Sequence, residues 1–145
     1  MAIAATSGYS GTPLPKKLGL KDGMAVLFVD LPKHLAALKT AAAFKTLAES
    51  GITHVRRAGQ GFDFVHVFTA SRKDLATAVK PLMDAIVREG MIWVSWPKKA
   101  SGVPTDITED VIREVVLPIG LVDVKVAAVD EIWSGLKLVI RKELR

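Results

Sequence analysis

The chain has 145 residues, of which 50% are hydrophobic, and it carries 20 Lys and Arg against 15 Asp and Glu. This length and hydrophobic content indicate one folded domain with a sizeable core and exclude disorder for most of the chain. The sequence contains no cysteine, which excludes disulfides, thiol catalysis and thiolate metal sites.

The longest uncharged stretch, residues 1–15, is interrupted by Gly, Ser, Thr and Pro residues. A membrane span needs about 20 mostly apolar residues, and a secretory signal needs a basic start followed by a long apolar segment. The stretch has neither pattern. We therefore expect a cytoplasmic protein that makes no membrane contact.

A Gly-, Ser- and Pro-rich arm at residues 1–23 precedes a single α/β domain at residues 24–145. The arm is expected to pack on that domain through three leucines, Leu14, Leu18 and Leu20. The continuous apolar run at residues 24–29 predicts a strand buried on both faces. Pro32 and the Ala-, Leu- and Lys-rich residues after it predict a helix over residues 33–49.

The second and third strands are predicted at residues 52–56 and 62–69. Ser71, followed three residues later by Asp74, is typical of a helix N-terminus, because the two side chains can satisfy unpaired backbone donors. An apolar stripe continues this helix towards Gly90. Pro81 lies inside it and is expected to kink or restart it.

A fourth strand is predicted at residues 91–96, followed by a loop. Asp106, with Glu109 three residues on, predicts the N-terminus of the next helix. The alternating segments at residues 121–129 and 136–141 predict an antiparallel hairpin, with Trp133 in its link. The whole order predicts an α/β three-layer sandwich of about six strands, mostly parallel, with the hairpin as an antiparallel edge.

Three segments carry a specific resemblance: GYSGTPLPKKLGL near the start, WVSWPKKASGVPTD in the middle and GLVDVKVAAVDEIWSGLK near the end. On these the chain resembles a family of small bacterial proteins that share a domain of unknown function, numbered 3052. That resemblance implies no activity.

A looser resemblance is to the class I S-adenosylmethionine methyltransferase fold, which is Rossmann-like. LGLKDGMAVLFVD looks like the first strand of that fold, FDFVHVF like the fourth, GMIWVSWP like the fifth, and the hairpin like the last two. The fold implies a glycine-rich turn after the first strand and an acid at the end of the second. Here the turn reads DLPKHLA, and the predicted second strand ends in Arg56 and Arg57. The predicted order also lacks one strand–helix unit of that fold.

In an open α/β sheet, ligands bind beyond the carboxyl ends of the strands, where the strand order reverses. Three loops are expected to meet there, and the richest runs from Trp96 to Thr105. A helix beginning near Asp106 would offer an anion its positive end. The candidate ligand-binding residues are Trp96, Lys98, Lys99, Ser101, Gly102, Asp30 and Thr69. The alternative is a solvated loop whose prolines only fix its path.

Other polar residues are weaker candidates. His34, just past the first strand, could be a general base, whereas His66 among phenylalanines reads as a buried structural histidine. Tyr9, Ser10 and Thr12 could fold over the site as a lid. Four basic doublets could make a phosphate-binding patch if they converged; they are Lys16–Lys17, Arg56–Arg57, Arg72–Lys73 and Lys98–Lys99.

We therefore predict a small α/β module on a methyltransferase-like scaffold that binds an anionic small molecule or a protein and does not itself transfer a methyl group. The first alternative is a minimal S-adenosylmethionine-dependent methyltransferase. The second is a nucleic-acid binder, which ranks lower because no reading motif accompanies the doublets. A homodimer through sheet edges or helices is compatible with the pattern, no metal site is predicted, and no cofactor is assigned.

Overall fold

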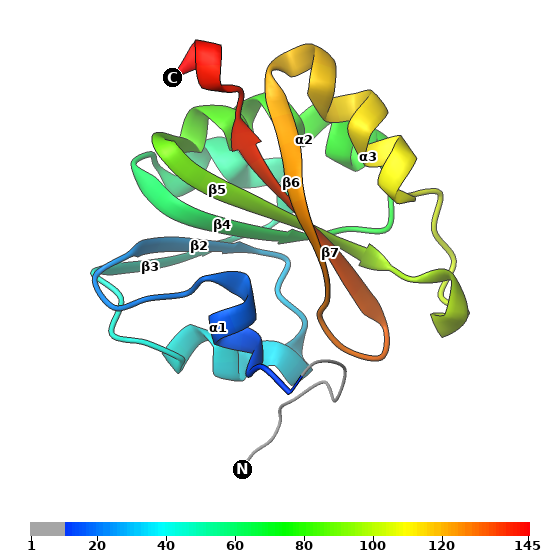
Figure 1. Ribbon diagram of the computed structural model, residues 1–145, viewed down its shortest axis with the longest axis horizontal. Helices are drawn as coiled ribbons and strands as arrows, with labels where there is room; N and C mark the ends of the chain where they lie inside the picture. The colour runs from blue at the N-terminus through cyan, green and yellow to red at the C-terminus, as the bar shows by residue number, and fades with distance from the viewer. Residues whose placement is uncertain (1–10) are drawn as a thin grey trace.

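The structure is a computed structural model that describes residues 11–145. Its centre is one six-stranded sheet in the order β3-β2-β4-β5-β7-β6 (Figure 1). The strands are β2 (Ala25–Val29), β3 (Thr46–Ser50), β4 (Phe62–Phe68), β5 (Ile86–Pro97), β6 (Leu121–Ala128) and β7 (Trp133–Ile140). The first four pair in parallel, and β7 pairs antiparallel with both β5 and β6.

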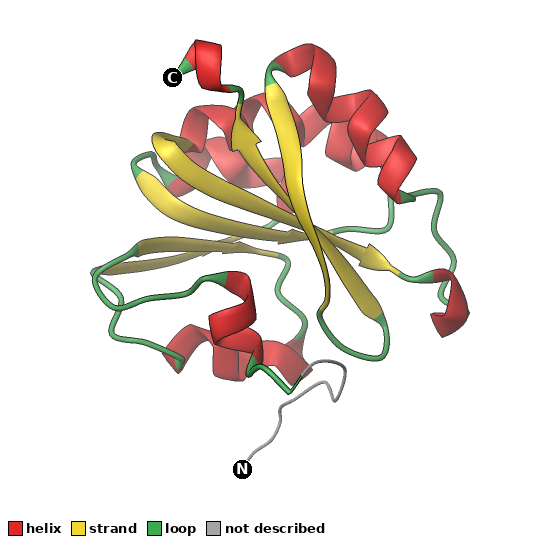
Figure 2. Cartoon of the chain, viewed as in Figure 1, coloured by secondary structure: helices red, strands yellow, loops and turns green. Residues whose placement is uncertain are grey.

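Helices cover both faces of the sheet (Figure 2). One face carries α2 (Arg72–Ala85), α3 (Glu109–Val116) and the 3-10 helix η2 (Ile52–Ala58). The other carries the short α1 (Leu14–Leu18) and the 3-10 helix η1 (Lys33–Thr40). The predicted three-layer α/β sandwich, with its six mostly parallel strands and antiparallel hairpin, is confirmed.

The strands β2 and β4 are buried because each has a strand on both sides and helices over both faces. Their alternate residues therefore join different cores. Leu27 and Val65 pack under α2, whereas Phe28 and Phe64 pack under α1 and η1. Trp93 and Trp96 of β5 likewise lie on opposite faces.

The end of the arm packs on the domain as predicted. Leu18 and Leu20 are buried in the second core, with Leu14 packed against it. The indole Nε1–H of the fully buried Trp93 donates to the carbonyl of Leu18 at 2.9 Å. The sheet therefore holds α1 by a polar contact as well as by apolar burial.

Two neighbouring predictions were wrong. The helix expected over residues 33–49 is a 3-10 helix that ends at Thr40, and residues 46–50 form the edge strand β3. The strand expected at residues 52–56 is instead the 3-10 helix η2. Residues 46–50 favour a helix by composition, but pairing with β2 holds them extended. The second strand of the sheet is therefore residues 46–50 and not residues 52–56.

Three smaller boundaries also differ. The helix α2 runs through Pro81 and ends at Ala85, so β5 begins earlier than predicted. The N-cap of α3 is Thr108 rather than Asp106, and its hydroxyl accepts from the amide of Val111 at 3.2 Å. Trp133 is the first residue of β7 and not part of a link.

The predicted lid residues Tyr9 and Ser10 lie outside the described residues, whereas Thr12 lies inside them and is half-buried. Over residues 11–145, none of the helices combines the length and the apolar character that crossing a bilayer requires.

Candidate functional site

The strand order reverses between β2 and β4, because β3 follows β2 on one side and β4 lies on the other. The carboxyl ends of these two strands are therefore where an α/β sheet binds ligands. Asp30 directly follows β2, and Thr69 directly follows β4. The structure thus places these two predicted residues at the switch point.

Asp30 has an unusual backbone. Among residues 11–145 it is the one residue other than glycine with a positive φ, at 55°. Its amide donates to the carbonyl of Ser50 at 2.9 Å, and its Oδ2 accepts from the amide of Ile52 at 3.1 Å. A side chain in this region costs roughly 1 kcal/mol or more, and such strain concentrates at functional sites. Asp30 makes the sharp turn that a glycine would otherwise make.

The end of β3 corrects an expectation about acidic residues. Glu49 is the penultimate residue of this strand, so the second strand of the sheet does carry a carboxylate at its carboxyl end. The side chain of Glu49 is 54% exposed, and its Oε2 lies 3.3 Å from Nζ of Lys39. Arg56 and Arg57 occupy η2 instead. The turn after β2, residues 30–36, contains no glycine.

A second polar pair lies at the same end of the sheet. Nε2 of His34, in the first turn of η1, is 2.7 Å from Oδ2 of Asp130 in the β6–β7 turn. The other carboxylate oxygen of Asp130 accepts from the amides of Ile132 and Trp133 at 2.8 and 2.7 Å. Asp130 is thereby fixed and holds the imidazole. Sequence reasoning named His34 and missed Asp130, which lies 96 residues away.

The loop after β5 docks on the loop after β4, as expected. Thr105 Oγ1 donates to the carbonyl of Ala70 at 2.9 Å. The carboxylate of Asp106 accepts from the amide of Arg72 at 2.7 Å, so Asp106 caps α2 and not its own helix. Thr69 is buried, and its Oγ1 accepts from the amide of Ser71 at 3.2 Å. These contacts fix the two loops to each other.

A cavity of about 410 Å³ lies beside this loop, and Trp96, Lys98 and Lys99 all line it. Ser101 and Gly102 do not line it. The hydroxyl of Ser101 donates to the carbonyl of Lys98 at 2.7 Å and accepts from the amide of Val103 at 3.1 Å. The predicted seven residues therefore divide into a switch-point pair, a cavity group and a pair in the turn of the loop.

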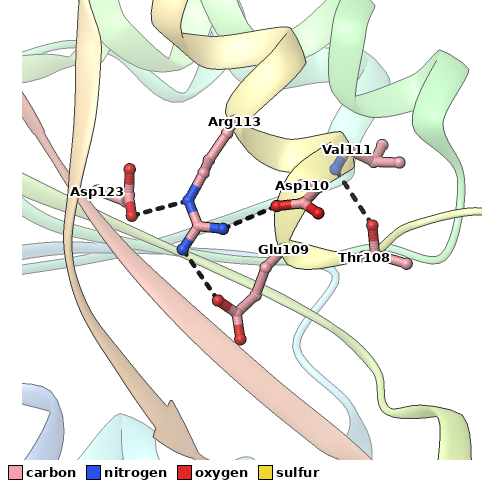
Figure 3. Close-up of polar contacts among 6 residues, drawn as sticks. All are labelled: Thr108, Glu109, Asp110, Val111, Arg113 and Asp123. Atoms are coloured by element: carbon pink, nitrogen blue, oxygen red, sulfur yellow. Dashed lines mark hydrogen bonds and ion pairs between the residues drawn. The ribbon is translucent and has the colours of Figure 1, made fainter.

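The far wall of this cavity comes from α3 and carries an ion-pair network (Figure 3). The guanidinium of Arg113 contacts Asp123 and Asp110 at 3.0 Å and Glu109 at 2.9 Å. Hydrogen bonds, above all with Asp123, raise the pKa of Arg113 above its ordinary value. Arg113 is paired with three carboxylates, and Lys98 and Lys99 are the other two cationic residues that line this cavity.

His66 is fully buried, as the sequence indicated. Burial lowers the pKa of its imidazole to about 3, so the ring is neutral at physiological pH. Nε2 lies 2.7 Å from Ser95 Oγ, and the ring stacks on Phe68 with centroids 4.2 Å apart. It is a structural residue. Across residues 11–145, no three His or acidic side chains gather in a way that could hold a metal ion.

No protein-family model matches the chain, and no curated protein matches its sequence at a significant level. Solved structures do match. An S-adenosylmethionine-dependent methyltransferase from Aquifex aeolicus superposes with a TM-score of 0.67 at 15% identity, over 86% of each chain. The magnesium protoporphyrin IX methyltransferase of Synechocystis PCC 6803 gives 0.64 at 14% identity, over 89% of this chain and 74% of that one.

The ribosomal protein L11 methylase of Lactobacillus delbrueckii gives a TM-score of 0.62 at 11% identity, over 88% of this chain and 75% of that one. At such identities the likeness concerns the fold alone. The chain therefore has the Rossmann-like α/β fold of class I S-adenosylmethionine methyltransferases.

Proposed function

We propose that the chain binds S-adenosylmethionine at the carboxyl ends of β2, β3 and β4 and is a small methyltransferase. The observation that carries the proposal is Asp30, a strained acidic residue at the end of the central strand. It lies at the switch point, and the neighbouring strand carries a second acid, Glu49, as its penultimate residue. The likeness to methyltransferase structures supports the same ligand.

The residues fit the nucleoside part of this ligand. A carboxylate such as that of Glu49 can accept hydrogen bonds from both hydroxyls of a ribose. The side chain of Lys39 is half-buried and that of Glu49 is exposed, so their ion pair at 3.3 Å holds Glu49 only weakly. Pro32, in the turn, has no amide N–H. Contacts from this turn would therefore come from side chains and not from a glycine-rich backbone.

S-adenosylmethionine, when bound, supplies an electrophilic methyl group. His34 would remove the proton of a hydroxyl or amine acceptor, since a neutral imidazole can act as a base near neutral pH. Asp130 would orient that ring through Nε2 and leave Nδ1 to face the acceptor, because Nδ1 has no hydrogen bond within residues 11–145. Asp130 is thus a positioning residue.

The experiment is calorimetric titration with S-adenosylhomocysteine, the demethylated product. Glu49→Gln removes the charge that would hold the ribose and is expected to weaken binding about tenfold, the loss of one charge-assisted hydrogen bond. Glu143→Gln is the matched control, because Glu143 is also an exposed ion-paired acid but lies near the C-terminus. Equal affinities for the two variants would contradict the proposed site.

A test of His34 uses product release from S-adenosylmethionine with a panel of small and macromolecular acceptors. His34→Gln should abolish turnover, and Asp130→Asn should lower it while altering its pH profile. His54→Gln is the control, because His54 is an exposed histidine of η2. Full turnover by His34→Gln would remove the base from the mechanism.

The cavity beside Trp96 favours a second candidate, an anion-binding module without chemistry. Lys98 and Lys99 line it. Burial lowers the pKa of Lys17, and repulsion from Lys125 and then Lys98 lowers it further, so positive charge gathers near this loop. An anion bound there would relieve that repulsion. Replacing both Lys98 and Lys99 by Ala should abolish a thermal shift produced by simple phosphates or nucleotides. An unchanged shift would exclude this site.

A further inference from the structure

A second and larger cavity lies between η2 and α2, and it begins at Ile52, the residue whose amide donates to Asp30. Its volume is about 720 Å³, which is within the range that holds small-molecule ligands. Its walls include Ile52 and Val55 of η2 and Pro81 of α2, which supply apolar surface. We call this cavity the η2–α2 groove.

Four cationic side chains line the η2–α2 groove: Arg56, Arg57, Lys73 and Lys80. The two lysines are seven residues apart, which places them on the same face of α2. Two of the four basic doublets in the sequence therefore contribute to one site. Asp74 is the one carboxylate among the lining residues.

The cations differ in how far they are neutralised. Arg56 and Lys80 share one carboxylate, with Asp84 at 3.6 Å from each. The side chains of Arg57 and Lys73 make no hydrogen bond or ion pair within residues 11–145, and both residues are exposed. The groove thus retains a positive excess from two elements that face each other.

We propose that the η2–α2 groove binds a phosphate-bearing ligand of nucleotide size, either free or as part of a single strand. Guanidinium groups match the geometry of phosphate oxygens, and lysines add charge without a directional requirement. The apolar wall gives a sugar or base a surface to lie on. The proposal does not depend on binding of S-adenosylmethionine, which would take place at the carboxyl ends of the strands.

The test measures binding of ADP by calorimetry and of a fluorescein-labelled single-stranded oligonucleotide by polarisation, at several salt concentrations. The groove variant is Arg57→Gln with Lys73→Gln. The control is Lys16→Gln with Lys21→Gln, which removes the same charge from exposed lysines on the opposite layer. Circular dichroism melting would verify that both variants fold.

We expect the groove variant to lose about tenfold or more in affinity. For the oligonucleotide, the slope of log affinity against log salt should fall by about 1.4, which is about 0.7 for each of the two phosphate contacts removed. The control should stay within about twofold of wild type. Binding of ADP would identify a free nucleotide, and binding of the oligonucleotide alone would identify a strand. Wild-type protein that binds neither probe, or equal losses in the two variants, would overturn the proposal.

Discussion

Acidification is expected to destabilise this protein through one residue, His66. Its pKa falls from the ordinary value of 6.5 to about 3 in the folded chain because burial disfavours the imidazolium. Between these values the unfolded chain holds a proton that the folded chain does not, so stability is complete above pH 6.5 and falls as the pH is lowered. Each pH unit below 6.5 in this window lowers the free energy of unfolding by about 1.4 kcal/mol. The loss is therefore about 2 kcal/mol at pH 5.

The assay is urea unfolding at pH 7, 6 and 5, with the free energy of unfolding extrapolated to water. The informative variant is His66→Phe combined with Ser95→Ala, which replaces a buried hydrogen-bonded pair by apolar groups. Its stability should fall by less than half as much as that of wild type over the same range. His54→Gln, at an exposed histidine, should keep the wild-type dependence. Equal losses in wild type and the double variant would refute the assignment to His66.

Three further changes test the packing and the loops. Trp93→Phe leaves the carbonyl of Leu18 without its donor and should cost about 1–3 kcal/mol in urea unfolding; an unchanged midpoint would mean that the bond contributes nothing. Gly120→Ala places a Cβ on a residue whose φ is 119° and should lower the free energy of unfolding by about 1–2 kcal/mol. The readout is a lower Tm, and an unchanged Tm would show that the turn relaxes. Asp106→Ala removes the acceptor for the amide of Arg72 and should cost about 1 kcal/mol, whereas Asp106→Asn should restore most of it.

The fold could be predicted where local pattern and tertiary environment agree. The runs that became β2, β4 and β5 are apolar on both faces, as fully covered strands require. The predictions failed where the local pattern and the tertiary environment disagree. Residues 46–50 are rich in good helix formers, and they extend only because β2 offers a partner. Ile52–Ala58 contains β-branched residues, but the carboxylate of Asp30 accepts the first amide of a 3-10 helix there.

In the candidate site, too, some residues could be predicted from the sequence and others could not. Residues at strand ends, such as Asp30 and Thr69, could be placed because parallel strands share one carboxyl edge. The grouping of Trp96 with two lysines followed from their neighbourhood in the chain. The contact of His34 with Asp130 could not be predicted, because it joins elements far apart in the sequence whose proximity depends on the whole sheet.

The most direct test of the central claim is to map the binding of S-adenosylhomocysteine by NMR of the ¹⁵N-labelled protein. We predict saturable shifts concentrated in the amides of residues 30, 31, 33, 34, 49–51 and 69–70, where three strands end. Shifts confined to η2 and α2, or to the loop after Trp96, would assign the ligand to another site. A spectrum that does not change at millimolar ligand would contradict the proposal that this scaffold binds the methyltransferase cofactor.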